Sequence, residues 1–131
     1  MKEIIIDNVV YCLTPKETQE ILYNDWRLPT IKELLTIVDY DKHTPACQLA
    51  DTELEYYWSS TTYVPYAGNA WSIGFYSGDT YAGIKNFNFY VRCVRDGNDG
   101  LEWSKTSEHA MIWHEAIEYA KNLSAPVYYK G

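Results

Sequence analysis

Period-two alternation of apolar and polar residues between residues 56 and 94 constrains the fold of this chain most strongly. Residues 69–76 set Ala70, Ser72 and Gly74 against larger apolar side chains, and residues 87–94 alternate in the same way. Such alternation is typical of half-buried strands, and the turn residues Ser77–Asp79 separate the two segments. With a strand that begins at Tyr56, the pattern predicts a three-stranded antiparallel meander whose third strand is residues 87–94.

Helix signals flank this region. Thr14-Pro15 with Glu17 predicts a capped helix that runs to about Tyr23 and buries Ile21 and Leu22, and Thr30 with Glu33 predicts a second capped helix. Apolar spacing predicts a third helix over residues 111–123. Residues 4–13 are expected to form a strand interrupted at Asp7-Asn8, and residues 39–55 to form a polar, irregular loop. The chain therefore has α+β character, and its 131 residues predict a single domain over 1–131.

Charge and composition narrow the functional classes. The formal net charge is −7 and the sequence pI is about 4.8, without a basic stripe, so direct binding of nucleic acid is not expected. The chain shows no signal-peptide pattern at its start and no apolar stretch long enough to span a membrane. A cytoplasmic location is the expectation, with a virion component as the alternative. The widely spaced Cys12, Cys47 and Cys93 predict free thiols, with one disulfide and a spare thiol as the alternative.

Aromatic residues are abundant: 13 Tyr, 5 Trp and 3 Phe. One core of this size cannot enclose so many rings, so some Tyr side chains are expected on the surface. Exposed Tyr supplies a large contact area at low cost in side-chain entropy, but Tyr also suits half-buried strands. The two interpretations carry equal weight.

Four motifs occur in a recognisable order, namely Asp25-Trp26-Arg27-Leu28-Pro29-Thr30-Ile31-Lys32-Glu33-Leu34, Tyr57-Trp58-Ser59-Ser60-Thr61, Ala70-Trp71-Ser72-Ile73-Gly74-Phe75 and Tyr90-Val91-Arg92-Cys93-Val94-Arg95. Residues 24–95, which contain them, resemble the C-terminal domain of the Legionella collagen-like protein. The resemblance implies a C-type-lectin-like fold: a short twisted antiparallel sheet with two to three helices, akin to phage receptor-binding and diversity-generating variable proteins. Such domains bind ligands that differ between members, through exposed loops and strands.

The chain departs from the family pattern after residue 100. Segments like 101–105 and 111–119 usually precede the Asp-Trp-Arg-Leu-Pro motif, but here they follow the last motif. Residues 101–131 therefore resemble a C-terminal helical extension that is either permuted or exchanged with a neighbouring chain, which would give a homo-oligomer. Ala120 stands where the family often has a cysteine, so a disulfide from this position to Cys93 is unavailable.

Most motif residues suit a scaffold. Trp58, Trp71 and Phe75 are candidate core rings. Arg92 and Arg95 are expected to pair with buried carboxylates or carbonyls.

The patterns that would indicate catalysis or metal binding do not occur. The acidic residues of the 39–55 loop could surround an ion, but a solvated loop is the preferred interpretation. His114-Glu115 is followed at position 118 by Glu rather than by the His of a zinc-protease motif. We therefore expect no enzyme activity, no metal and no cofactor.

A binding role is easier to support. The segments 62–69 and 76–88 lie between the scaffold motifs, where loops and outward strand faces usually carry function. The candidate binding residues are Tyr63, Tyr66, Tyr76, Asp79, Tyr81, Lys85 and Asn86. The first hypothesis is a non-enzymatic recognition domain for a protein partner, with a glycan as the second choice and a phage origin in keeping with the family. The alternative is an intracellular acidic inhibitor that occupies the nucleic-acid-binding surface of a host defence protein, as anti-CRISPR proteins do.

Overall fold

The computed structural model describes residues 2–13 and 21–131. In chain order its elements are β1 (Lys2–Ile6), β2 (Val9–Leu13), α1 (Ile31–Leu35), β3 (Tyr56–Thr62), β4 (Asn69–Gly74), β5 (Asp79–Ile84), β6 (Arg92–Asp96), β7 (Leu101–Thr106), α2 (Trp113–Asn122) and β8 (Tyr129–Lys130).

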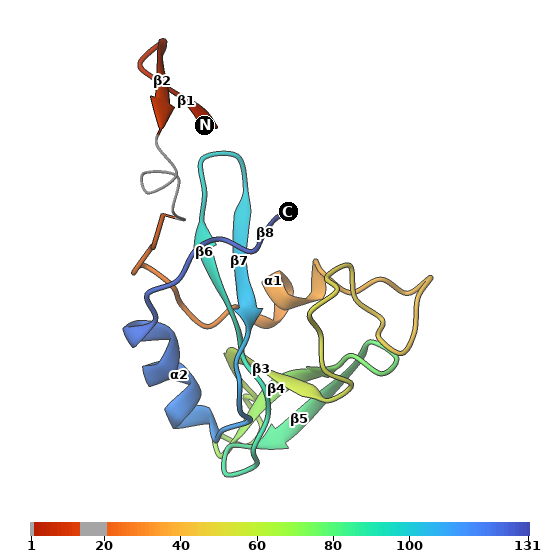
Figure 1. Ribbon diagram of the computed structural model, residues 1–131. Coiled ribbons are helices and arrows are strands. Elements are labelled where there is room, and N and C mark those ends of the chain that lie inside the picture. Colours follow the sequence, from red (N-terminus) through yellow and green to blue (C-terminus); the bar gives the residue numbers. More distant parts are fainter. Residues whose placement is uncertain (1, 14–20) are drawn as a thin grey trace.

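Two three-stranded antiparallel sheets form the body of the molecule, in the orders β3-β4-β5 and β6-β7-β8 (Figure 1). A parallel bridge between Tyr57 and Tyr90 joins the sheets, since Trp58 N–H donates to the Tyr90 carbonyl at 3.0 Å. The α2 helix lies on one side of the β6–β7 hairpin and the 39–55 loop on the other. Mixed α+β architecture is therefore confirmed.

The predicted meander exists, but its third strand was placed wrongly. Gly78, at φ 88°, reverses the chain directly after β4, so residues 79–84 pair with β4. Most of residues 87–94 do not continue this sheet. Phe89 and Tyr90 form isolated bridges, and β6 begins at Arg92 in the second sheet.

The second predicted helix is confirmed with its capping box. Thr30 Oγ1 accepts from Glu33 N–H at 3.2 Å, and Glu33 Oε1 accepts from Thr30 N–H at 2.9 Å. Arg27 adds a bidentate pair, with Nη1 and Nη2 at 2.6 and 2.7 Å from the two Glu33 carboxylate oxygens. One glutamate thus begins α1 and fixes the motif ahead of it.

The N-terminal region differs from the expectation. Residues 2–13 form a hairpin rather than one interrupted strand, because Asp7 and Asn8 both adopt positive φ. Most of the helix predicted from Thr14 lies outside the described residues. Ile21 and Leu22, expected to be buried, are exposed: this segment is not helical, and the neighbouring Tyr23 pairs through its backbone with Ala125.

Two apolar clusters form the core. The first lies around Leu34, Tyr57, Ile73, Phe75 and Trp103. The second contains Trp26, Trp58, Cys93, Ala116 and Ala120, so α2 packs on the core of its own chain through two small residues, which allow a close approach. Trp58 and Phe75 are core rings as predicted.

The prediction that Trp71 is a core ring is wrong. It is only half-buried, and its ring meets Tyr63 edge-on at 5.1 Å. Successive strand residues point to opposite faces, so Trp71 does not share the face on which Ala70 and Ser72 are fully covered.

Cys47 and Cys93 are free, buried thiols, as expected, while the side chain of Cys12 lies outside the described part. Burial raises the pKa of the Cys93 thiol to about 12, which makes it a poor nucleophile.

Glu33 should make stability depend on pH. The Arg27 hydrogen bonds hold the pKa of its carboxyl below the 4.5 of an unperturbed glutamate, so its stabilisation is full above that value and is lost as pH falls through the lower, folded-state pKa. We expect Glu33→Gln to lower the free energy of unfolding by about 1 kcal/mol at pH 7 and to flatten its decline below about pH 5. Urea titrations at several pH values measure both effects. An unchanged acid limb would contradict this role.

Candidate functional site

Four aromatic rings lie in a row on one face of the β3-β4-β5 sheet. The ring centroids of Tyr81 and Tyr56 are 5.2 Å apart, those of Tyr56 and Phe89 are 5.2 Å apart, and those of Phe89 and Phe87 are 5.9 Å apart. The row rests on the core, because the Phe89 centroid lies 4.4 Å from that of the fully buried Trp58. We call these four rings, together with the neighbouring Tyr76, the aromatic surface.

Two glycines allow the rings to lie against the sheet. A Cβ atom at Gly83 would come within 2.6 Å of the Phe89 ring, and one at Gly74 within 2.8 Å of the Tyr56 ring. Glycine in a strand often marks a close approach of this kind. The rings are therefore held from beneath while their other sides face outward.

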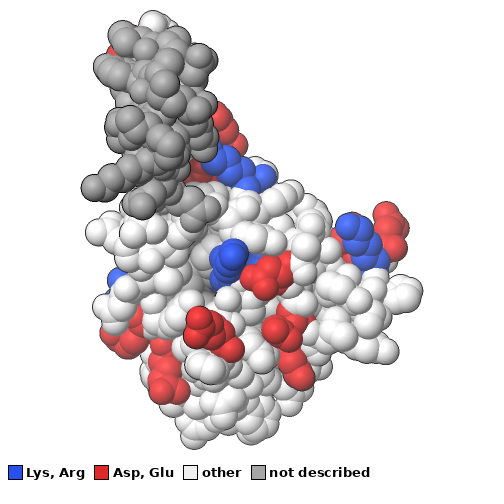
Figure 2. All heavy atoms as spheres, viewed as in Figure 1, with Lys and Arg blue, Asp and Glu red and all other residues white. Residues whose placement is uncertain are grey.

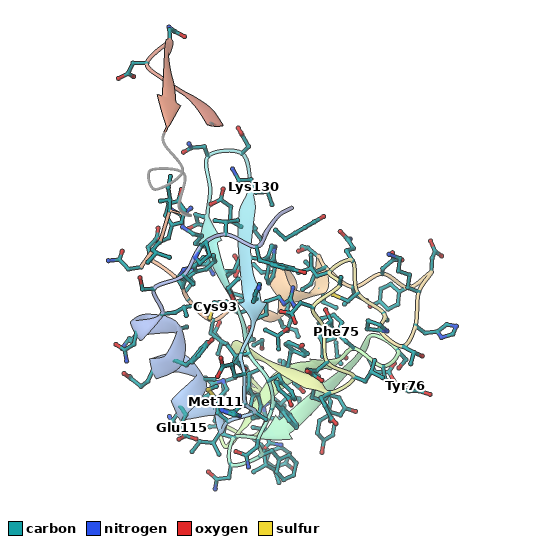
Figure 3. The ribbon with its side chains drawn as sticks, in the orientation of Figure 1. Phe75, Tyr76, Cys93, Met111, Glu115 and Lys130 are labelled. Atoms are coloured by element: carbon teal, nitrogen blue, oxygen red, sulfur yellow. The ribbon has the colours of Figure 1, made fainter. Side chains whose placement is uncertain are left out.

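A hollow of about 200 Å³ adjoins one end of the aromatic surface. Tyr76 borders it with 63% of its surface exposed, whereas the preceding Phe75 points into the core (Figure 3). Two carboxylates, of Glu55 and Asp79, border the same hollow. Asp79 Oδ2 accepts from Ser77 Oγ at 2.8 Å, which orients this acid. The hollow thus combines aromatic walls with negative charge.

The seven predicted binding residues do not form one group. Tyr76, Asp79 and Tyr81 share the face just described, with 41% of Tyr81 exposed. Tyr63 and Tyr66 stack on each other at 6.1 Å in the β3–β4 connection.

The stacked pair belongs to the opposite face of the sheet. Tyr63 packs on Trp71, which pairs with Ala82, whereas Tyr81 pairs with Ser72. Neighbouring strand residues point to opposite faces, so Trp71 and Tyr81 lie on different sides.

Lys85 and Asn86 follow β5. Lys85 Nζ donates to Thr62 Oγ1 at 3.0 Å and lies 3.9 Å from the centre of the Trp113 ring. This lysine therefore attaches the end of the sheet to α2, and a scaffold role accounts for its contacts. Asn86 is exposed.

Tyr56, Phe87 and Phe89 belong to the site but were not among the candidates from sequence. The alternation of Phe87 and Phe89 with polar residues predicted a shared strand face and gave no sign that this face binds. The available signal was the pair Gly74 and Gly83, whose missing side chains leave space for rings on the sheet.

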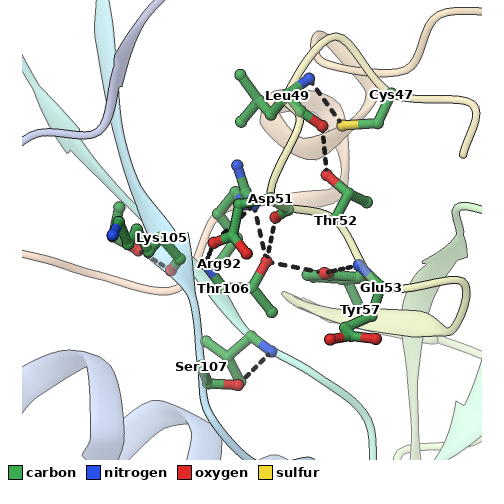
Figure 4. A network of polar contacts seen from close by, with 12 residues as sticks. Cys47, Leu49, Asp51, Thr52, Glu53, Tyr57, Arg92, Lys105, Thr106 and Ser107 are labelled. Atoms are coloured by element: carbon green, nitrogen blue, oxygen red, sulfur yellow. Dashed lines mark hydrogen bonds and ion pairs between the residues drawn. The ribbon is translucent and has the colours of Figure 1, made fainter.

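A buried network fixes the loop that carries the edge of the hollow (Figure 4). Arg92, with 1% of its side chain exposed, donates from Nη2 to Thr106 Oγ1 at 2.7 Å and lies 3.6 Å from an oxygen of Asp51. Thr106 Oγ1 donates to the Asp51 carbonyl at 2.6 Å and contacts Tyr57 Oη at 2.8 Å, which accepts from Glu53 N–H. Strands β3, β6 and β7 thereby hold residues 51–53.

The hydrogen-bond partners of Arg92 do not satisfy all N–H groups of its buried guanidinium. Its Nη1 has no hydrogen-bond partner among the described residues, and burial lowers the pKa of the guanidinium. Arg95, also predicted to pair with a buried carboxylate, bonds to the buried Glu102 and to the exposed Asp25, which confirms this prediction. For Arg92 the carboxylate partner differs from the prediction, because the Asp51 side chain is half-exposed.

Acidic side chains are spread over the face seen in Figure 2 rather than gathered into one patch. No group of three metal-ligating side chains occurs within residues 2–13 and 21–131 as described. Two acids of the 39–55 loop have internal roles: Asp51 in the Arg92 network, and Asp39 as acceptor from Asp41 N–H at 3.0 Å. A second hollow, of about 240 Å³, is lined by polar residues at the β6–β7 turn and the C-terminus.

Comparison with known proteins gives one match. The family model described as the Lcl C-terminal domain matches residues 8–95. No curated protein and no solved structure matches the chain significantly. In the described part of the chain, no helix has the length and apolar character needed to cross a membrane.

Gly83 provides a test of the aromatic surface. A Cβ at this position would force the Phe89 ring away from Trp58. We expect Gly83→Ala to lower the free energy of unfolding by about 2 kcal/mol and to change tryptophan fluorescence. Gly68→Ala is the matched control, since a Cβ there meets nothing within 4 Å. Equal stability of the two variants would show that Phe89 does not lie on Gly83.

Asp51 provides a test of the network. Asp51→Asn removes the carboxylate beside a buried guanidinium. The free energy of unfolding, measured by urea denaturation, should therefore fall by about 2 kcal/mol. Asp99 is exposed, and Asp99→Asn is the control. That control should change the free energy of unfolding by less than about 0.5 kcal/mol. An unchanged free energy of unfolding for Asp51→Asn would mean that burial of Arg92 does not depend on this carboxylate.

Proposed function

The chain belongs to the Lcl C-terminal domain family, a membership that supports a binding role, and from this premise we propose that it is a recognition domain that binds a protein partner through the aromatic surface. One observation carries the proposal: aromatic rings packed against the sheet remain partly exposed in a continuous row. Tyr and Trp dominate the energetically important positions of interfaces, because large rigid rings lose little entropy on binding.

A non-enzymatic role is part of this proposal. Arg92, Tyr57 and Cys93 contact structural neighbours and do not line either hollow. Arg95 and Glu102 line the hollow at the β6–β7 turn, where they pair with each other. The hollow beside Tyr76 offers two carboxylates and exposed rings, which suit a contact with cationic or amphipathic side chains. A protein supplies both along one segment, and a glycan is the second choice of ligand.

The fold is proposed to be C-type-lectin-like. Family membership and the two antiparallel sheets flanked by helices support this topology. We further propose that residues 101–131 supply, in permuted order, the segment that usually comes first in the family. In the single chain these residues complete the second sheet through β7 and β8 and cover the core with α2.

An acidic inhibitor is the second candidate function. The net charge of −7 and the spread of acidic side chains favour a basic partner surface, such as the nucleic-acid-binding surface of a host defence protein. Contacts of this kind weaken steeply with salt, whereas aromatic contacts do not. A cytoplasmic location belongs to this candidate.

The Tyr81→Ser variant tests the first candidate function, recognition through the aromatic surface. The tagged protein is used to capture partners from the natural host, and the affinity of a purified partner is then measured for each variant. We expect Tyr81→Ser to weaken binding at least about tenfold, the effect of an interface ring worth ~1.4 kcal/mol. Tyr66→Ser is the control, because Tyr66 is also exposed but stacks on Tyr63 at the opposite face of the sheet, away from the aromatic surface.

The outcomes separate the two candidates. Weaker binding of Tyr81→Ser at both low and high salt supports the aromatic surface. Equal binding by both tyrosine variants, with loss of the complex at high salt, rejects the aromatic surface and favours the inhibitor.

A further inference from the structure

The hollow beside Tyr76 carries negative charge that no cation of the described chain balances. Tyr56, Tyr76, Glu55 and Asp79 border it, and its lining contains neither Lys nor Arg. Among the residues that the structure describes, no Lys or Arg nitrogen lies within 4.0 Å of the Glu55 or Asp79 carboxylate. The hydrogen bond from Ser77 Oγ orients Asp79 but leaves its charge in place.

The sheet register brings a ring and a carboxylate to this point. Tyr56 pairs with Gly74, and Gly74 pairs with Asp79 on the other side. Residues directly opposite each other on neighbouring strands point to the same face of a sheet. The Tyr56 ring lies over Gly74, and Asp79 is on the same face one strand further along. The pairing of β3, β4 and β5 therefore fixes aromatic and acidic groups next to each other.

Arg95 shows how this chain itself binds a guanidinium with such groups. Its Nε and Nη2 donate to the two carboxylate oxygens of Asp25 at 2.7 and 3.0 Å, and its Nη1 donates to Glu102. Its guanidinium carbon lies 3.8 Å from the centre of the Tyr23 ring. One ring and two carboxylates thus hold one arginine, and the hollow beside Tyr76 offers the same kinds of group without the arginine.

The lysines of the described chain pair differently. Lys42, Lys121 and Lys130 each contact a single carboxylate, at 4.0, 3.7 and 3.4 Å, whereas Arg27 reaches two different carboxylates. A guanidinium is planar and has five N–H donors, so it can face two carboxylates and stack on a ring at once. It is also less strongly hydrated than an ammonium. A site of two carboxylates and two rings therefore favours arginine over lysine.

The size of the hollow limits what it can hold. Its volume is about 200 Å³, whereas pockets for whole small molecules measure about 300–1,000 Å³. A single side chain suits this volume better than a cofactor or an oligosaccharide. The side chain would come from a protein segment that lies along the neighbouring rings.

We propose that the hollow beside Tyr76 takes an arginine side chain of the protein partner, whose guanidinium lies against the tyrosine rings and donates to the carboxylates of Glu55 and Asp79. This inference rests on the proposed function, because it names the residue that anchors the partner on the aromatic surface. The rest of the aromatic surface then covers apolar groups that flank this arginine.

Titration of the ¹⁵N-labelled full chain with propylguanidinium, followed by amide NMR at about 0.15 M salt, tests the proposal. We expect saturable shifts at residues 55–56 and 74–79, with a dissociation constant on the order of a few millimolar. Propylurea has the same planar shape without the charge and should give no saturable shift. Butylammonium has the charge without the planar donors and should bind at least about threefold more weakly.

Two double variants with the same net charge identify the acids that bind the probe. Glu55→Gln with Asp79→Asn should weaken propylguanidinium binding at least about tenfold, because both charged acceptors become neutral. Asp99→Asn with Glu108→Gln is the control, since both acids are exposed and neither borders this hollow. The control should bind the probe like the wild type, and the amide spectrum of each variant reports whether it is folded.

Three results would overturn the proposal. The first is the absence of a saturable shift at the hollow with propylguanidinium. The second is binding of propylurea or butylammonium as tight as that of propylguanidinium. The third is equal affinity of the two double variants for the probe, because general attraction to an acidic protein would then explain the shifts.

The titration contains no partner protein, so its outcome is separate from that of Tyr81→Ser. If Tyr81→Ser weakens partner binding but propylguanidinium does not occupy the hollow, the aromatic surface stands and the arginine anchor is rejected. If the probe occupies the hollow but Tyr81→Ser leaves partner binding unchanged, the proposed function is rejected and the guanidinium site stands by itself.

Discussion

The buried guanidinium of Arg92 is the constraint on which the arrangement of this domain depends. It lies where β6, β7 and the 39–55 loop meet, and it reaches Thr106 and Asp51 while one of its nitrogens has no partner in the described structure. A charged group in such a place is tolerated only where its neighbours are fixed, because desolvation is costly. The loop has no helix or strand of its own, so this network and the contact with Tyr57 fix its end at residues 51–53, while the N–H groups of Thr44 and Ala46 bond to the backbone after β4 and hold its middle.

The position of that loop has a consequence for recognition. Leu54 and Glu55 follow directly after the residues that the network anchors, and they form one border of the hollow beside Tyr76. On the other border, Gly74 lets the Tyr56 ring approach the sheet. A contact surface whose rings are held in this way loses little conformational entropy on binding. The same packing that stabilises the core therefore prepares the surface.

Local signals were predictable from sequence, whereas relations across the sheet were not. Thr30 with Glu33 identified a helix start because a capping box is made within one turn. Strand β5 was missed because glycines in and beside it give it the composition of a loop, and its strand character comes from pairing with β4. The candidate tyrosines of segments 62–69 and 76–88 divide between two faces, because strand parity decides the side. Only the packing that brings Gly83 beneath Phe89 shows that this ring belongs to the aromatic surface.

Charge and aromatic rings would act on different stages of binding. The negative net charge, which favours a basic partner, and the exposed rings, which favour an apolar contact, are therefore compatible with one and the same partner. A net charge of −7 raises the rate of encounter with a basic surface, and this contribution falls with ionic strength. In the proposed complex the aromatic surface would act after contact, because desolvation of Tyr56, Tyr76 and Tyr81 would slow dissociation. Glu55 and Asp79 lie beside these rings, so both contributions converge on one place. A partner that presents a cationic side chain next to an apolar one would use both, and the salt dependence of its association rate would then exceed that of its dissociation rate.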